Sequence, residues 1–455
     1  MTEAQNVIPV KTLDDEPQTV PGTEQLNSSD YESEEFRQGK KRYPWWVKTV
    51  DRITTETDEA RLSKPQMNFL MHKLLVEGEE AQAAIEQSKE VVAGKVRDKV
   101  PGYSLRDLAL HYAANTYQNG TIGSLGDPAF NPFPGLQEIQ NTWKLHPPQS
   151  LGLPAWEASP QEAAETVEKA AVQLGAPMIG ITTINPDWLS AGVEISPDVD
   201  EVTVDGMTRI LPERLKYVIS VIGVCPPDLT LRNQTELGAA GDRAGYEAFG
   251  MATTRLLRFI KGLGYTAIDG ISFGPQIPHA IASGLGELGR MNRMINPIFG
   301  GNVRLGAIFT DLPLAIDKPI DFGLQRFCVG CKKCATACPG QALSLEDHPV
   351  WEPFNEWQAG GKKAYFEDNR KCNDFQKGQD MYCSTCMSVC PWSKQDKTAL
   401  HELAHIMGAK LPFLSSLLTK MDDLFGYGLV SEKQKLEEWW DLDNPVRGVD
   451  SSQGR

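Results

Sequence analysis

The chain has 455 residues and a formal net charge of −15 at pH 7. This length allows a full hydrophobic core and more than one domain. The negative charge disfavours nucleic-acid binding, because phosphate contacts need a basic surface. No stretch reaches the roughly 18 consecutive apolar residues of a membrane span. The first residues contain neither an apolar signal core nor a twin-arginine pattern, so we expect no export signal in this form of the chain.

Five segments of different composition follow one another. Residues 1–42 are rich in polar and acidic side chains, so we expect a disordered or draped arm. Residues 43–154 have helical patterning broken by aromatic, Gly and Pro residues, which is typical of a wrapping segment. Residues 155–323 predict an α/β core, residues 324–395 form a cysteine-rich module, and residues 396–455 predict a helical tail.

The α/β core is predicted from helices that alternate with strands. A Ser-Pro start, a capping box and a final Gly indicate a helix over residues 159–175. The strand MIGITTI follows, and a second helix is expected from about residue 239 to 263. The strand YTAID, a Gly/Pro-rich loop and the strand VRLGAIFTDLPL complete one sheet.

Eight of the nine cysteines fall into two groups with the spacing of metal ligands, leaving Cys225 alone. The first group has the C-x2-C-x2-C-x3-C-P pattern of bacterial ferredoxins, and Cys372 completes the second group. Two four-cysteine zinc sites are the alternative, which the proline-closed run disfavours. Following the ligand exchange of ferredoxins, we expect one [4Fe-4S] cluster on Cys328, Cys331, Cys334 and Cys390, and a second on Cys338, Cys372, Cys383 and Cys386.

The core contains no dinucleotide or phosphate-loop motif. Its glycine-rich segment GLGELGRMN, residues 284–292, fits two interpretations. One is a helix-to-strand turn that needs positive φ, and the other is a cradle whose bare backbone approaches a cofactor.

The sequence HELAH, residues 401–405, matches the H-E-x-x-H zinc-protease motif, with Glu432, Glu437 or Glu438 as a third ligand. It lies after the cysteine groups, in a short tail without the sheet edge that a peptide substrate would pair with. We therefore interpret it as an exposed helix that carries two histidines.

The blocks FIKGLGYTAI, SGLGELGRMN and NVRLGAIFTDLPLAIDKPIDFG, followed by the two cysteine runs, resemble the catalytic subunit of corrinoid-dependent reductive dehalogenases. The resemblance covers residues 155–430. It implies a nitroreductase-like α/β core that binds a base-off cobamide, next to a bacterial-ferredoxin-like module with two [4Fe-4S] clusters. The implied reaction converts R–X, two electrons and a proton into R–H and halide, with Co(I) as the reductant.

The resemblance also implies the reacting side chains. Tyr246 would be the proton donor, and Arg304 would favour its phenolate, because a nearby guanidinium lowers the pKa of a phenol. On residue spacing alone, a surface tyrosine and a solvated strand arginine are the alternatives. The family places Asn or Lys on the loop after the YTAI strand. Here that loop reads DGISFGPQIPH, so Ser272 or Gln276 would take the role.

The cofactor and substrate contacts are inferred in the same way. We expect the cobamide against Gly286, Glu287, Arg290 and Asn292. Phe375 and Tyr382 match a loop that the family folds over the active site. Packing around an iron-sulfur cluster is the alternative for both aromatic residues.

Two other classes of protein were weighed. Epoxyqueuosine reductases share the cobalamin core and both clusters, but a tRNA-modifying enzyme needs a basic groove that this acidic chain does not favour. A simple ferredoxin does not need so large a companion core. The PWW start at residues 44–46 is typical of respiratory dehalogenases and favours small chlorinated alkenes or alkanes as substrates.

The resemblance implies partners and a location as well. Respiratory members work at the outer face of the cytoplasmic membrane, held by a small hydrophobic anchor subunit and fed by a respiratory electron donor. We therefore expect a processed, membrane-associated mature chain, with a cytoplasmic enzyme as the alternative. A homo-oligomer is compatible with both, and no nucleic-acid partner is expected.

Overall fold

The computed structural model describes residues 36, 43–64, 91, 93–103, 148, 154–205, 208–355, 358–379, 382–394, 399–430, 436 and 438–441. The predicted acidic arm, apart from residue 36, lies outside the described residues, as does most of the predicted wrapping segment. Glu432 and Glu437, considered above as metal ligands, also lie outside them.

A four-stranded antiparallel sheet forms the centre of the core, in the order β2-β6-β10-β7. Its strands are β2 (Ile179–Thr183), β6 (Tyr217–Val224), β7 (Ala267–Asp269) and β10 (Val303–Thr310). β6 and β10 pair over their whole lengths. Nearly all of their residues are buried, as expected for short, continuously apolar strands in the middle of a covered sheet.

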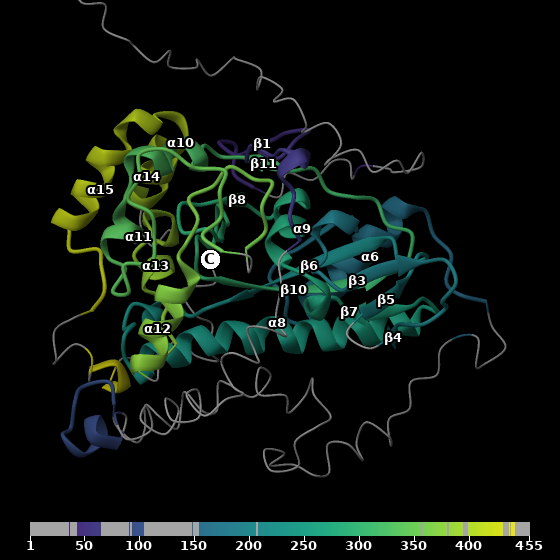
Figure 1. Ribbon diagram of the computed structural model, residues 1–455, viewed down its shortest axis with the longest axis horizontal. Helices are drawn as coiled ribbons and strands as arrows, with labels where there is room; N and C mark the ends of the chain where they lie inside the picture. The colour runs from purple at the N-terminus through teal and green to yellow at the C-terminus, as the bar shows by residue number, and fades with distance from the viewer. Residues whose placement is uncertain are drawn as a thin grey trace, which may run out of the picture.

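Helices cover both faces of this sheet (Figure 1). α6 (Pro160–Gln173) and α8 (Glu236–Gly262) pack on one face, where Phe249 joins the core. α9 (Gln276–Ala282) covers the opposite face through residues such as Ile281. The mixed α/β core predicted from the sequence is therefore confirmed.

The helix starts reflect their caps. α6 begins as predicted, because the Ser159 hydroxyl accepts a hydrogen bond from the Glu162 backbone N–H at 3.2 Å. α8 begins at Glu236, three residues before the predicted start at about residue 239. The reason is Thr235, whose hydroxyl accepts a backbone hydrogen bond and caps the first turn.

Three small sheets surround the central one: β3-β5-β4, β8-β9 and β1-β11. Their strands are β1 (Lys48–Thr49), β3 (Val193–Ser196), β4 (Thr203–Asp205), β5 (Thr208–Pro212), β8 (Glu287–Leu288), β9 (Met294–Ile295) and β11 (Ile320–Asp321). The pairing of β1 with β11 attaches residues 43–64 to the end of the core. In the described part of the chain, short helical segments lie between the strands: η1 (Glu59–Arg61), η4 (Pro186–Trp188), α7 (Pro227–Thr230) and η5 (Ile271–Phe273).

The cysteine-rich region and the tail form a helical group beside the sheet (Figure 1). The cysteine-rich helices are α10 (Leu324–Gly330), α11 (Lys333–Thr336), α12 (Asn369–Gln379), α13 (Thr385–Ser388) and η6 (Pro391–Ser393). The tail contains α14 (Ala399–Lys410), η7 (Pro412–Leu414), α15 (Ser415–Leu424) and η8 (Glu438–Asp441). Within the described ranges, no helix has the length and apolar character needed to cross a bilayer. The domain boundaries drawn from the sequence stay predictions.

The HELAH helix is α14, and the expectation that it exposes both histidines is wrong for His405. That residue is 4% exposed, because its ring stacks on Trp392 with 5.1 Å between the ring centroids. The His401 ring instead makes a 3.0 Å hydrogen bond with the Tyr427 hydroxyl. The two imidazoles therefore serve different packing contacts.

Candidate active site

A cavity of about 240 Å³ opens between the α/β core and the cysteine-rich region. Tyr246 from α8, Gln276 from α9 and Arg304 from β10 line it on the core side. The opposite wall contains Tyr382 and the second cysteine group: Cys338, Cys372, Cys383 and Cys386. A phenol, a guanidinium and one complete set of predicted cluster ligands therefore face the same space.

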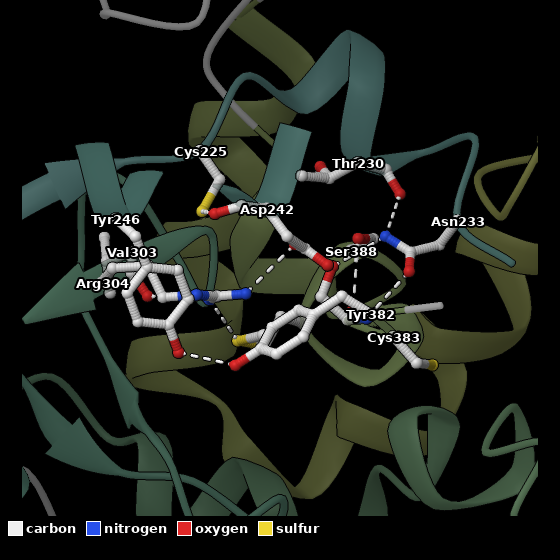
Figure 2. Close-up of polar contacts among 12 residues, drawn as sticks. Cys225, Thr230, Asn233, Asp242, Tyr246, Val303, Arg304, Tyr382, Cys383 and Ser388 are labelled. Carbon is white, nitrogen blue, oxygen red and sulfur yellow. Dashed lines mark hydrogen bonds and ion pairs between the residues drawn. The ribbon is translucent and has the colours of Figure 1, made fainter. Parts of the chain in front are cut away.

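Two tyrosine hydroxyls meet in this cavity (Figure 2). The oxygens of Tyr246 and Tyr382 lie 2.6 Å apart, and either hydroxyl can be the donor. Their rings are nearly perpendicular, with 5.9 Å between the centroids. Residues 136 positions apart in the sequence thus form one phenol pair.

Arg304 lies beside this pair and is held by a buried ion pair. Its Nη2 donates to Asp242 Oδ1 at 3.0 Å, and the two side chains are 7% and 0% exposed. Its Nη1 donates to the Met387 sulfur at 3.1 Å, and its guanidinium carbon lies 5.1 Å from the centroid of the Tyr246 ring. Asp242 is one helical turn before Tyr246 on α8, so a single helix positions both the anion and the phenol.

The charges in the cavity are fixed by these contacts. Burial opposes ionisation of Arg304, but Cys225 and Asp242 outweigh burial and raise the pKa of the guanidinium above its ordinary value. Burial is also the main cause of the raised pKa of Tyr382, with Tyr246 adding to it. Arg304 is therefore a permanent cation, and Tyr382 is a neutral hydroxyl.

Arg243 is a second cation at the pair, and the sequence analysis missed it. Its guanidinium carbon lies 4.0 Å from the centroid of the Tyr382 ring and 5.9 Å from that of Tyr246. Contacts at this distance are favourable cation–π interactions. Arg243 lies in the same DRAGYEAF block as Tyr246, one helical turn earlier, so helical spacing was the signal that could have found it.

The cysteines approach one another in two sets. The pKa of Cys372 is raised to about 12, mainly by burial, with Cys383 and Cys338 among the further causes. The pKa of Cys390 is raised to about 12 by burial and by Cys331. The pKa of Cys334, of the first set, is also raised by Cys386 of the second, so the assignment of ligands to two clusters stays a prediction. Buried thiols with raised pKa values release their protons when a metal binds them.

Polar groups already point at the sulfurs of the second set. The Ala342 backbone N–H donates to Cys338 Sγ at 3.3 Å, and the Gln376 side-chain amide donates to Cys372 Sγ at 3.4 Å. Such hydrogen bonds tune cluster potentials. No three His, Cys, Asp or Glu side chains in the described ranges form a group that could hold a single metal ion, whereas thiolates around a four-iron cluster must enclose a larger object.

The predicted cobamide contacts lie in different surroundings. Glu287 is 1% exposed and binds the Thr54 hydroxyl at 2.6 Å and the Phe322 backbone N–H at 2.7 Å. Arg290 donates to the Cys328 carbonyl at 2.8 Å and lies 3.8 Å from the centroid of the Tyr365 ring. Both side chains thus support the protein around the first cysteine group. Their assignment to the cobamide stays a prediction.

The glycine-rich segment also meets a packing requirement. A Cβ added at Gly286 would come within 2.2 Å of the Ile295 carbonyl oxygen, so only glycine fits between β8 and β9. Asn292 has a positive φ of 53° and lines a second cavity, of about 350 Å³. Ile277, Arg293 and Glu367 line both cavities, so the two spaces adjoin.

The remaining predicted residues separate by position. Gln276 lines the smaller cavity, and its Nε2 donates to the Gly274 carbonyl at 2.6 Å. Ser272 is in η5. Phe375 packs beside Gly340, next to the Cys338-Pro339 pair, and is outside the lining of both cavities.

Comparison with known proteins gives two family matches. Residues 41–194 match the family model of the reductive dehalogenase subunit, and residues 327–393 match that of a 4Fe-4S double cluster binding domain. A solved reductive dehalogenase structure, described in connection with B12-dependent dehalogenation, matches with a TM-score of 0.61 at 22% identity. It covers 90% of this chain and 53% of the other, and it shows a shared fold.

Curated relatives agree with these matches. The tetrachloroethene reductive dehalogenase of Sulfurospirillum multivorans is 31% identical over 317 residues, which are 65% of this chain and 62% of the relative. The chain therefore spans less than two thirds of that relative's length. The chloroethene reductive dehalogenase of Dehalococcoides mccartyi strain VS is 26% identical over 80% of this chain and 79% of the relative. An epoxyqueuosine reductase of Atelocyanobacterium thalassa matches only 46% of the chain, at 28% identity. The family models, these relatives and the shared fold agree in showing that the chain is similar to the reductive dehalogenases.

Proposed function

We propose that this protein removes halide from small chlorinated alkenes or alkanes, converting R–X, two electrons and a proton into R–H and X⁻. The observation that carries the proposal is the smaller cavity, which is lined both by the Tyr246–Arg304 pair and by the second cysteine group. A reductive dehalogenation needs a proton donor and an electron supply at one carbon atom. The curated relatives, named for tetrachloroethene and chloroethene, support this class of substrate.

The residues around the two cavities fit a cobamide. Gln276 Oε1, in the smaller cavity, and Asn292 Oδ1, in the larger one, are buried and have no hydrogen-bond partner among the described residues. A buried acceptor without a donor costs free energy, and the side-chain amides of a corrin ring can supply donors. We propose that the cobamide binds base-off across these two adjoining cavities. When bound, the cobamide would supply the cobalt reductant that delivers electrons to the carbon–halogen bond.

The protein's own groups would then handle the proton. Tyr246 donates its hydroxyl proton to the carbon atom that loses halide, because its hydroxyl points into the cavity. Arg304 stabilises the resulting phenolate and cannot itself lose its proton, since the ion pair with Asp242 holds it charged. For the third polar contact, which the sequence left open between Ser272 and Gln276, we propose Gln276, because it lines the smaller cavity.

The two cysteine sets would carry the electrons. We assign one [4Fe-4S] cluster to Cys328, Cys331, Cys334 and Cys390, and the other to Cys338, Cys372, Cys383 and Cys386. The second cluster would be the immediate donor, because its ligands line the cavity and those of the first cluster do not. We further propose the finer architecture implied by the sequence: a nitroreductase-like core over residues 155–323 and a ferredoxin-like module over residues 324–395.

The cellular setting is part of the same proposal. We place the mature enzyme at the outer face of the cytoplasmic membrane, with a hydrophobic anchor subunit, a respiratory electron donor and a second copy of the chain as partners. Support comes from the resemblance to respiratory enzymes and from the PWW start of the described segment. Fractionation of the native host, with and without detergent, tests this placement.

The function is tested with anaerobically purified, full-length holoenzyme. We expect about eight iron atoms and about one cobalt atom per chain, and chloride release from tetrachloroethene with reduced viologen as the electron donor. Epoxyqueuosine in a tRNA stem-loop serves as the competing substrate. A folded protein that binds zinc and no cobalt, or a fully loaded enzyme that releases no chloride, contradicts the proposal.

A further inference from the structure

The cavity contains a polar group that the proposed mechanism does not yet use. Tyr382 directs its hydroxyl at the hydroxyl of Tyr246, 2.6 Å away (Figure 2). A separation this short is typical of a strong O–H···O hydrogen bond. Tyr382 comes from the cysteine-rich side of the cavity, whereas the other proton-handling groups come from the core.

The segment that carries Tyr382 is anchored by a buried amide. Asn233 Nδ2 donates to Ser384 Oγ at 2.7 Å, and Asn233 Oδ1 accepts the Ser384 backbone N–H at 2.8 Å. The same Nδ2 donates to the Thr230 carbonyl at 2.8 Å. Asn233 and Ser384 are 4% and 1% exposed, so water does not compete for these bonds. Two residues after Tyr382, the backbone is thus fixed to the end of α7.

The direction of the bond between the hydroxyls follows from the charges around them. Arg304 and Arg243 face both rings, and Asp242 forms an ion pair with Arg304. When Tyr246 gives up its proton, its oxygen becomes an anion that can only accept hydrogen bonds. The Tyr382 hydroxyl is the protein donor already within reach of that oxygen.

We propose that Tyr382 is a positioning residue of the proton-donating centre, whose hydroxyl donates to the Tyr246 oxygen and stabilises it as the phenolate forms. This inference rests on the proposed function. In the step concerned, the Tyr246 O–H bond and the C–X bond break and a C–H bond forms, while the clusters and cobamide supply two electrons and halide leaves. Tyr382 keeps its own proton throughout, and Tyr246 regains one from solvent.

The Tyr382→Phe variant tests the proposal, because it keeps the ring over Arg243 and removes only the hydroxyl. We expect unchanged iron and cobalt content. The rate of chloride release should fall about 10- to 100-fold, because the variant loses one hydrogen bond to a charged oxygen. Losing that donor makes Tyr246 a weaker acid. The alkaline limb of the pH–rate profile should therefore move up by about one unit or more.

A matched control is Tyr365→Phe. Tyr365 also lies under an arginine, with Arg290 3.8 Å from its ring centroid, and its hydroxyl donates to the Asp347 carbonyl at 3.1 Å, outside both cavities. We expect its pH–rate profile to match that of the wild type. If Tyr382 had a merely structural role, Tyr382→Phe would lower the rate by the same factor at every pH and leave the alkaline limb of the pH–rate profile in place. That result overturns the proposal.

A second readout needs no turnover. Fluorotyrosine placed at position 246 reports its own ionisation by ¹⁹F NMR, and its pKa should rise when Tyr382→Phe is added. If Tyr382→Phe does not fold, fluorotyrosine at position 382 keeps the hydroxyl as a stronger donor and should move the alkaline limb down. If neither substitution at position 382 shifts the ionisation of residue 246, the inference is refuted. A loaded wild-type enzyme that releases no chloride refutes the proposed function instead, and the NMR titration still decides the hydrogen bond.

Discussion

The two walls of the catalytic cavity are built in different ways. On the core side, Tyr246 and Arg304 project from α8 and β10, elements held by long ladders of backbone hydrogen bonds. On the cysteine-rich side, Tyr382 and Cys383 lie on a short segment before α13 that is anchored by the amide of Asn233. The core side therefore owes its geometry to regular structure, and the other side depends on a few side-chain bonds and on its cluster.

The largest effect should follow from removing a ligand on the cysteine-rich side. Cys372→Ala takes one thiolate from the second predicted cluster, so we expect iron to fall from about eight to about four atoms per chain and chloride release to be lost. Cys225→Ser is the control, because Cys225 belongs to neither cysteine set and its variant should keep its iron. Full iron content in Cys372→Ala would show that this cysteine is no ligand.

On the core side, the largest loss of stability should follow from breaking the buried ion pair. Asp242→Asn leaves the charged Arg304 without its counter-ion, at a site where the two side chains are 0% and 7% exposed. We expect a loss of about 3–5 kcal/mol in the free energy of unfolding, measured by denaturant titration under anaerobic conditions. Asp51→Asn, which breaks the exposed pair with Lys318, should cost less than about 1 kcal/mol. Equal losses in both variants would contradict this account of the pair.

The Asn233 anchor of the cysteine-rich side should contribute less to the free energy of unfolding than the buried ion pair of the core side. Asn233→Ala removes three hydrogen bonds and leaves the Ser384 backbone N–H buried without its acceptor. We expect a loss of about 1–3 kcal/mol in the free energy of unfolding and faster amide exchange at residues 382–384 than elsewhere. Exchange that accelerates equally in α8 would mean that the two walls are not independently held.

The smallest expected effect concerns Glu287, where burial and the nearby Asp321 raise the pKa to about 7 from 4.5. A folded-state pKa above the unfolded value means that stability is greatest below pH 4.5 and is lost as the pH rises to about 7. Over the accessible range from about pH 5.5 to pH 7, we expect a loss of about 1–2 kcal/mol. Glu287→Gln should flatten this dependence in thermal unfolding. An unchanged slope would show that Glu287 does not titrate there.

The sequence predicted local features better than the meeting of distant ones. Cysteine spacing predicted two ligand sets, because ligand spacing in a ferredoxin-like run is a local property. The four cysteines of the second set line one cavity, and the assignment of all eight to clusters stays a prediction. The phenol pair could not be predicted, since its two residues are 136 positions apart and belong to different regions.

The glycine-rich segment shows a second limit. The pattern predicted that another group approaches the backbone of Gly286 closely. It did not show whether that group would be a cofactor or part of the protein. In the structure, the Ile295 carbonyl lies there. The side chains of Glu287 and Arg290 turn to backbone groups of the protein that no sequence pattern links to them.

The most direct test of the central claim is a single-turnover measurement of chloride release in the pre-reduced holoenzyme, comparing the wild type with Tyr246→Phe at equal iron and cobalt content. The account predicts one chloride per cobalt in the wild type and a rate at least about 100-fold lower in the variant, because the proton donor is gone. Equal rates in the two proteins would contradict it.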